Sequence, residues 1–348
     1  MIFAVAKRDI RGLNTLRFCA AVWVALSHGL VPLGSYSVQT TGLIHIALAI
    51  YNLAFNGVAA VLVFFVISGV CIHYPFACGA PFRTVPFLVR RIVRISLPVM
   101  AVTIIASRFG SAARGALAAV LWSVYCEMAY YAIYPVLRRV FVRVGIAPTV
   151  VVSFAAALIV LLLHWHVRYH WDMPLILTCI IGLPAWLLGC LLAQRVTANA
   201  PARAMSTPRI WLWRFSVWLY TVLALWFFYH GPIRVGHPAL LLPFYFLCYH
   251  WIFAEIVYWN KHVPLRFLES GGAWSYSLYL VHNIVIALTP ISAIAVWREG
   301  ALRLILVPLA ALVFYGVVEW PSHRLARELS RRANDYLQAW RARAAPTV

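Results

Sequence analysis

Acidic side chains are scarce in this sequence. Its 348 residues include only 9 Asp and Glu, against 29 Lys and Arg, and charged residues make up 11% of the chain. Soluble domains typically carry about 25% charged residues. Hydrophobic residues make up 64%, and the mean hydropathy is +0.85. This composition excludes an ordinary soluble domain and predicts an integral membrane protein.

Cysteine pairing motifs are also missing. The seven cysteines are an odd number, form no C-x-x-C pair, and lie mostly in apolar runs, so we interpret them as small packing residues. This predicts neither a disulfide framework nor a metal site. No repeat of 20–50 residues and no low-complexity segment is present, and we expect no cleavable signal peptide, because the first apolar run leads into further ones.

Long apolar segments dominate what remains, and each can span about 30 Å of hydrocarbon. Helices are expected, because an isolated strand in lipid would leave its backbone groups without partners. Residues 36–53 are uncharged and mildly apolar, which favours a re-entrant or interfacial segment. The predicted fold is an all-α polytopic membrane protein with about ten transmembrane helices, at 13–33, 54–75, 86–107, 116–137, 148–166, 173–193, 209–229, 238–258, 272–296 and 302–321.

The distribution of Lys and Arg predicts the orientation. With both termini in the cytoplasm, 23 of the 29 basic residues fall on the cytoplasmic side and six on the outer side. This asymmetry accounts for most of the net charge of +20, so no nucleic-acid partner is expected. We predict a multi-pass protein of the cell inner (plasma) membrane, with a transmembrane domain at 1–325 and a basic cytoplasmic tail at 326–348. Residues 322–343 are expected to form a helix against anionic headgroups.

Two polar residues share one face of the first apolar segment. Arg17 and His28 are eleven residues apart, which is about three helical turns and a rise of about 16 Å. If Arg17 lies near one membrane surface, His28 lies deep in the bilayer, where a polar residue is a candidate functional site. The alternative is a core histidine bonded to a neighbouring helix. Burial favours the neutral imidazole, which suits a general base for a hydroxyl group.

Glu127 is the acidic residue most clearly placed inside a predicted span. Unpaired, a carboxylate there would cost several kcal/mol, so we expect a cation, a histidine or a proton beside it. It is either catalytic or a structural pair between helices. Arg90, Arg91 and Arg94 lie at the cytoplasmic end of another span, and guanidinium groups there suit phosphates. Taken alone, that cluster is more typical of positive-inside topology.

Other motifs are weaker. Ser68-Gly69 indicates close helix packing, although the hydroxyl could line a substrate channel. The loop His164-Trp-His-Val-Arg-Tyr-His-Trp-Asp172 contains metal-compatible residues, but its aromatic residues and Arg168 favour an interfacial or acceptor-binding role. Glu319 is expected to snorkel to the cytoplasmic interface and pair with an arginine.

The order of these motifs resembles the acyltransferase-3 family of integral-membrane acyltransferases, which modify cell-surface carbohydrates. The resemblance covers about residues 10–325. It rests on Arg17-x10-His28, Phe64-Phe-Val-Ile-Ser-Gly69, Arg90-Arg-x2-Arg94 with Pro98, Trp122-Ser-x3-Glu127 with Tyr131 and Pro135, Ser275-Tyr-Ser-Leu-Tyr-Leu-Val-His282, and Glu319-Trp-Pro321.

The resemblance implies ten transmembrane helices and an acyl-coenzyme A co-substrate, usually acetyl-CoA, that enters from the cytoplasm. No permanently bound cofactor is expected. It also implies that Arg17 and His28 are essential, and that Arg91 and Arg94, with Arg90, Arg17 and Ser68 nearby, bind the donor. His28, with Glu127 as the second catalytic candidate, would then deprotonate a hydroxyl of an exopolysaccharide, lipopolysaccharide or glycolipid. A transient acyl-histidine is the alternative chemistry.

Two other functions fit the sequence. A secondary transporter or flippase could use His28 and Glu127 as a proton relay, although repeated halves with broken helices are not apparent. A structural subunit of a polysaccharide export complex is also compatible with the composition. The sequence does not specify the acceptor, the acyl group or the oligomeric state.

Overall fold

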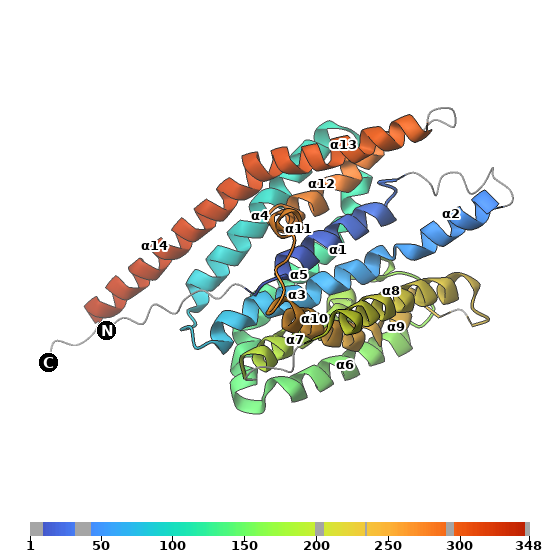
Figure 1. Ribbon diagram of the computed structural model, residues 1–348. Coiled ribbons are helices and arrows are strands. Elements are labelled where there is room, and N and C mark those ends of the chain that lie inside the picture. The colour runs from blue at the N-terminus through green and yellow to red at the C-terminus, as the bar shows by residue number, and fades with distance from the viewer. Residues whose placement is uncertain (1–9, 32–42, 199–204, 234, 290–295, 345–348) are drawn as a thin grey trace.

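The described part of the chain is helical and contains no strand (Figure 1). The computed structural model describes all residues except 1–9, 32–42, 199–204, 234, 290–295 and 345–348. The elements are α1 (Leu13–Ser27), α2 (Leu43–Ala54), α3 (Gly57–Ala77), α4 (Thr84–Arg108), α5 (Ser111–Val144), α6 (Ile146–Leu163), η2 (His170–Asp172), α7 (Leu175–Ala198), α8 (Thr207–His230), α9 (His237–Leu241), α10 (Phe244–Trp259), α11 (Arg266–Gly271), α12 (Ser275–Leu288), α13 (Val296–Phe314), η3 (Tyr315–Glu319) and α14 (Trp320–Ala344).

Seven helices in this part are long and apolar enough to cross a membrane, and α1 and α12 are shorter apolar helices. α4 is 25 residues long but carries several arginines. Over its described residues, each of the ten predicted spans overlaps one or more helices. The prediction of an all-α polytopic membrane protein is therefore confirmed.

Several predicted boundaries were wrong for local reasons. The first span was predicted to reach residue 33, but α1 ends at Ser27 because Gly29 adopts a left-handed φ of 88° and Leu30 N–H donates to Ala25 O at 3.0 Å. The region 238–258 is divided into α9 and α10. In the segment 36–53, helix α2 begins at Leu43, and residues 36–42 lie outside the described residues.

α3 is the central helix of the fold. It is apolar on all sides and buried along most of its length, as expected for a helix surrounded by others. Figure 1 shows it between α6 and α8 on one side and α13 and α14 on the other. Gly69 of α3 meets Gly189 of α7, where an added Cβ on Gly69 would lie 2.0 Å from Trp186 O. The prediction that Gly69 serves close packing is confirmed.

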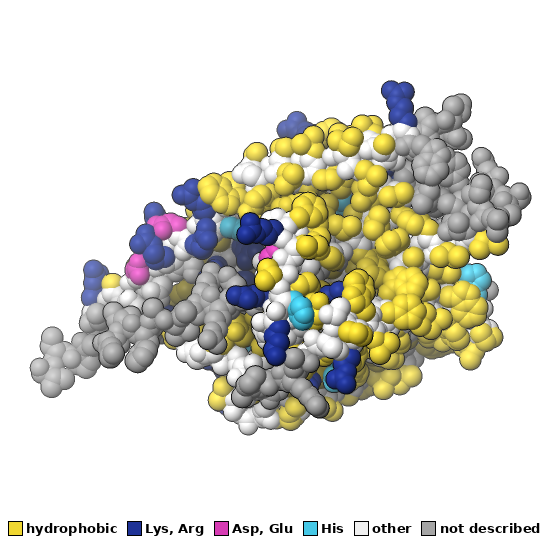
Figure 2. All heavy atoms as spheres, in the orientation of Figure 1, with side chains coloured by type: hydrophobic (Ala, Val, Ile, Leu, Met, Phe, Trp, Pro, Cys, Tyr) yellow, Lys and Arg dark blue, Asp and Glu magenta, His cyan; other side chains and the backbone are white. Residues whose placement is uncertain are grey.

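α14 continues the chain as one helix, so the predicted helix at 322–343 is confirmed, and the predicted domain boundary at 325 falls inside it. α14 packs antiparallel on α4, where Ser330 Oγ donates to Pro86 O at 2.8 Å. Figure 2 shows Lys and Arg side chains gathered toward the end from which α14 projects, and hydrophobic side chains over most of the remaining visible surface.

Candidate active site

A cavity of about 120 Å³ is lined by most of the predicted donor-binding residues, and we call it the arginine cavity. α1, α3, α4, α5, α12 and η3 contribute to its walls. Its charged lining residues are Arg17, Arg91, Arg94, Glu127 and Glu319.

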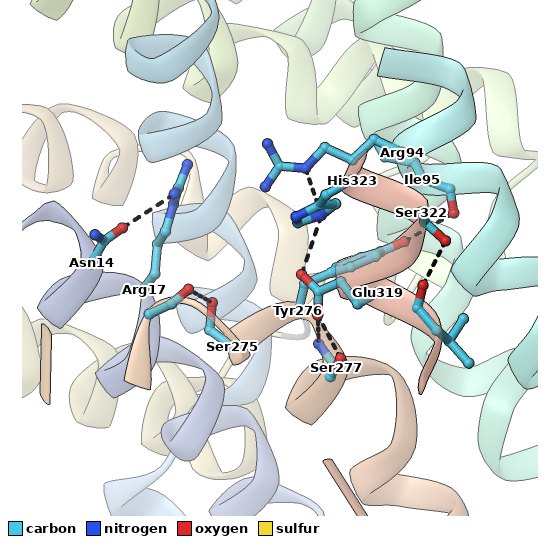
Figure 3. Close-up of polar contacts among 12 residues, drawn as sticks. Asn14, Arg17, Arg94, Ile95, Ser275, Tyr276, Ser277, Glu319, Ser322 and His323 are labelled. Atoms are coloured by element: carbon cyan, nitrogen blue, oxygen red, sulfur yellow. Dashed lines mark hydrogen bonds and ion pairs between the residues drawn. The ribbon is translucent and has the colours of Figure 1, made fainter. Parts of the chain in front are cut away.

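The three guanidinium groups of this cavity are held in different ways. Arg17 donates to Cys71 Sγ at 2.9 Å. Figure 3 shows its second bond, to Asn14 Oδ1 at 3.5 Å, and the bond from Arg94 Nε to His323 Nε2 at 2.9 Å. Arg91 lies against the ring of Tyr131, 5.9 Å from its centroid, and its Nε is buried without a hydrogen-bond partner. A buried donor without a partner is costly, so this arrangement suits an anionic ligand.

Glu319 closes one side of the arginine cavity. The chain is π-helical over Tyr315–Glu319, and the side chain is only 1% exposed. It accepts from Ser277 N at 3.0 Å and from Ser277 Oγ at 2.5 Å, and His323 Nε2 lies 3.4 Å from its Oε1 (Figure 3). Because His323 Nε2 accepts a hydrogen bond from Arg94, this nitrogen carries no proton and the His323 ring is neutral. We therefore interpret its contact with Glu319 as one made by a neutral imidazole and not as an ion pair. The prediction that Glu319 snorkels to the interface was wrong, because the π-helical turn directs it inward.

Glu127 ends a chain of hydrogen bonds across α3, α5 and α7. Trp186 Nε1 donates to Ser68 Oγ at 3.2 Å, Ser68 Oγ lies 2.9 Å from the Tyr131 hydroxyl, and Tyr131 donates to Glu127 Oε1. Trp186 donates to the Ser68 oxygen, and Tyr131 uses its own proton in the bond to Glu127. Ser68 must therefore donate its hydroxyl proton to Tyr131. The Ser68 hydroxyl is thus engaged in holding Tyr131, and Ser68 does not line the arginine cavity.

A second cavity, of about 210 Å³, contains His28, and we call it the histidine cavity. It lies between α1, α3, α5, α8 and the loop before α7. Val61 and Tyr279 line both cavities, so the two adjoin at these side chains. Gly57 lets α3 approach this end of α1, since an added Cβ would lie 2.2 Å from Ser27 Oγ.

The hydrogen bonds of His28 define its tautomer. Its Nδ1 lies 2.9 Å from Val24 O and 3.4 Å from both Ser27 Oγ and His282 Nε2. A carbonyl oxygen only accepts, so Nδ1 carries the proton in the neutral ring. The lone pair is then on Nε2, which has no hydrogen-bond partner among the described residues. This geometry suits a general base or a nucleophile.

Aromatic side chains form part of the wall of the histidine cavity. Tyr169 stacks on Trp171, with ring centroids 4.7 Å apart, and Trp122 stacks on His170 at 5.4 Å. His170 is fully buried, and burial, with a smaller effect of His237, lowers its pKa to about 3. The loop predicted to have an interfacial or acceptor-binding role therefore presents rings to the cavity that contains His28.

The structure brings Arg17, Arg91, Arg94 and Glu127 together and places His28 in the adjoining cavity. Arg90 is exposed and lies outside the arginine cavity. Glu127 and His28 share no hydrogen bond, and the described residues provide no hydrogen-bonded path between them. Sequence reasoning missed the contacts of His282 and His323. The only available sign was that both are histidines close to the two C-terminal motifs.

Residues 10–319 match a family model, that of the acyltransferase-3 family, described as an acyltransferase domain. No curated protein and no solved structure matched the chain in the corresponding searches.

Proposed function

This chain belongs to the acyltransferase-3 family and is a membrane acyltransferase, and from this premise we propose that it is an acyl-CoA-dependent O-acyltransferase. It transfers an acetyl or other short acyl group to a hydroxyl of an exported or lipid-linked poly- or oligosaccharide. The observation that carries the proposal is the position of His28. Its Nε2 has no hydrogen-bond partner among the described residues, and His28 lines a cavity that adjoins a cluster of arginines.

In this proposal the donor enters the arginine cavity from the cytoplasm. Arg17, Arg91 and Arg94 neutralise its phosphate groups, and the Arg91 Nε supplies a donor that has no partner within the described protein. A cavity of about 120 Å³ suits the narrow thioester arm better than the nucleotide. The adenosine, beyond the phosphates held by these arginines, would therefore lie at the mouth, where the exposed Arg90 adds positive charge.

The acceptor enters the histidine cavity from the other side of the membrane. Sugar rings have apolar faces that stack on aromatic rings, and Trp122, Tyr169 and Trp171 offer such rings near His28. His28 Nε2 takes the proton of the acceptor hydroxyl while the hydroxyl oxygen attacks the thioester carbonyl. The C–O bond forms, the C–S bond breaks, and the proton passes from His28 to the leaving thiolate. The products are the O-acyl sugar and free CoA.

A transient acyl-histidine is compatible with the same atoms. In that case His28 Nε2 attacks the thioester directly and CoA leaves as the thiolate. The acceptor hydroxyl oxygen then attacks the acyl group on the ring, the C–N bond to Nε2 breaks, and the hydroxyl proton passes to the thiolate. Both routes need a lone pair on Nε2.

Purified protein with labelled acetyl-CoA and a panel of oligosaccharides tests the proposal. We expect free CoA to appear only with a suitable acceptor, together with a labelled product. His28→Ala should remain folded and inserted but transfer no label, while His230→Ala, at the exposed end of α8, serves as the matched control. Wild-type transfer rates in His28→Ala would refute the assignment of His28 as the general base. Proton-coupled flux without CoA release would indicate a transporter, and no activity in either assay would indicate a structural subunit.

A further inference from the structure

His282 is a fully buried histidine with a defined tautomer. Its side chain is 0% exposed, and its Nδ1 lies 2.8 Å from Tyr279 O and 3.1 Å from Leu278 O. Both neighbours are carbonyl oxygens, which accept and do not donate, so Nδ1 carries the proton. The neutral ring therefore has its lone pair on Nε2. A buried imidazole surrounded in this way has one acceptor atom to offer, and its position defines what the ring can do.

That atom faces His28. His282 Nε2 lies 3.4 Å from His28 Nδ1, and the ring centroids are 5.1 Å apart with an angle of 63° between the planes. His28 Nδ1 carries a proton, as its bond to Val24 O requires. Besides the Ser27 hydroxyl at 3.4 Å, this N–H thus faces two acceptors, Val24 O on its own helix and His282 Nε2 on α12. Rotation of the His28 ring would lose both, whereas either acceptor alone would permit more freedom.

We propose that His282 is a positioning residue whose Nε2 accepts from His28 Nδ1–H and so directs the His28 Nε2 lone pair into the histidine cavity. The inference rests on the proposed function, because it assigns a role relative to the reacting atom of His28. In many acyl-transfer sites a carboxylate orients the base. Here the orienting group is a neutral imidazole, which suits a site surrounded by apolar helices.

A neutral His282 also fits the proton transfers of the proposed reaction. When His28 Nε2 takes the hydroxyl proton, His28 becomes a cation with two N–H groups, and its Nδ1–H still faces the lone pair of His282. A hydrogen bond to a cation is stronger than a neutral one, so His282 stabilises the charged ring. His282 takes no proton, and the proton on His28 Nε2 is passed to the leaving thiolate.

A buried arginine fixes the distance between the two helices that carry these histidines. Arg303 is 5% exposed. It donates through Nη1 to Gly29 O at 2.8 Å, just after α1, and through Nη2 to Ile286 O at 3.1 Å, near the end of α12. Its Nε donates to Thr289 Oγ1 at 3.0 Å. A cation bonded to carbonyl groups at the C-terminal ends of two helices suits the negative ends of both helix dipoles. The two rings are therefore held by the protein framework as well as by their own contact.

Three substitutions of His282 separate positioning from packing. Gln places an amide oxygen close to the position of Nε2, so it can accept the hydrogen bond from His28. Asn has polar atoms close to the position of Nδ1 only. Leu has a polar atom at neither position. We expect His282→Asn and His282→Leu to lower kcat on the order of 100-fold with the KM of donor and acceptor changed less than about threefold. His282→Gln should recover at least about tenfold of that loss.

Two results would overturn the inference while leaving the proposed function intact. One is wild-type kcat in His282→Leu alongside inactive His28→Ala. The other is a folded Gln variant no better than Asn or Leu. Inactive wild-type protein, or active His28→Ala, would instead refute the proposed function itself.

A measurement on the unmodified protein covers the case in which the variants do not fold. Histidine-selective ¹⁵N labelling reports which ring nitrogen carries the proton, and the His28 signal is assigned by its loss in His28→Ala. We expect His28 to be protonated at Nδ1 and unprotonated at Nε2. The opposite tautomer would mean that His28 Nδ1 does not donate to His282, and the inference would fail.

Discussion

The hydroxyl of Tyr279 lies 2.7 Å from Ser123 Oγ, at the boundary between the arginine cavity and the histidine cavity. The same hydroxyl donates to Val120 O at 2.8 Å, so the ring is fixed on α5. Val61 is the other side chain shared by the two cavities. In the proposed function an acyl group moves from the arginines toward His28, so we expect the size of these two side chains at the boundary to select its length.

Val61→Ala tests this passage. The substitution removes two methyl groups from the boundary, so we expect the kcat/KM for butyryl-CoA relative to acetyl-CoA to rise by roughly tenfold, within the range for one or two methylenes. Val63→Ala is the matched control, because Val63 is equally buried on the same helix but lines neither cavity. An unchanged ratio in Val61→Ala, or an equal change in the control, would show that the boundary does not select the acyl group.

Arg91→Ala combined with Arg94→Ala should raise the KM for acyl-CoA by about tenfold to 100-fold, because two guanidinium groups that face the cavity would be lost. The KM for the acceptor should change little. The control is Arg331→Ala with Arg332→Ala on α14, where both arginines pair with Glu328 at the surface. Equal effects in the two double variants would mean that the arginines contribute only general positive charge.

Much of the fold follows from the sequence because lipid leaves few choices. Long apolar runs in a bilayer must be helical, and the described residues of the predicted spans are largely helical. The errors have local causes. α1 is shorter than its apolar run because Gly29 adopts a left-handed conformation, and Glu319 faces inward because the chain is π-helical just before α14. Neither a left-handed glycine nor a π-helical turn is encoded in hydrophobicity.

The site was less predictable, because its contacts join helices far apart in the chain. The spacing of Arg17 and His28 indicates a shared face, but it does not reveal that the face borders two cavities. His282 is 254 residues from His28, and the bond between them depends on how α1 and α12 pack. Likewise, the sequence places Glu127 and His28 at similar depths in the membrane, which suggests that the two are partners. The structure instead bonds it to Tyr131, one turn along its own helix.

Glu127→Gln tests whether the carboxylate is catalytic. The amide oxygen of Gln can still accept from Tyr131, so the chain through Ser68 is retained while the charge is lost. For a carboxylate that takes part in proton transfer, the expected loss in a folded Glu127→Gln protein is at least about tenfold in kcat. Tyr131→Phe, which removes the hydrogen bond but keeps the charge, should have a smaller effect. Full activity in Glu127→Gln would show that Glu127 only positions its neighbours.

Gly69→Ala tests the packing on which both cavities depend. An added Cβ would lie 2.0 Å from Trp186 O and 3.0 Å from Gly189 Cα, so α3 and α7 would have to separate. Backbone cannot move aside as a flexible side chain can, and overpacking of this kind costs roughly 1–3 kcal/mol or more. We therefore expect a lower melting temperature in detergent and reduced transfer. Gly115→Ala on α5 is the matched control, since nothing lies within 4 Å of its added Cβ. There the better helix propensity of Ala should leave the melting temperature unchanged or slightly raised. Equal melting temperatures in the two variants would show that α3 and α7 tolerate separation and that their contact does not fix the site.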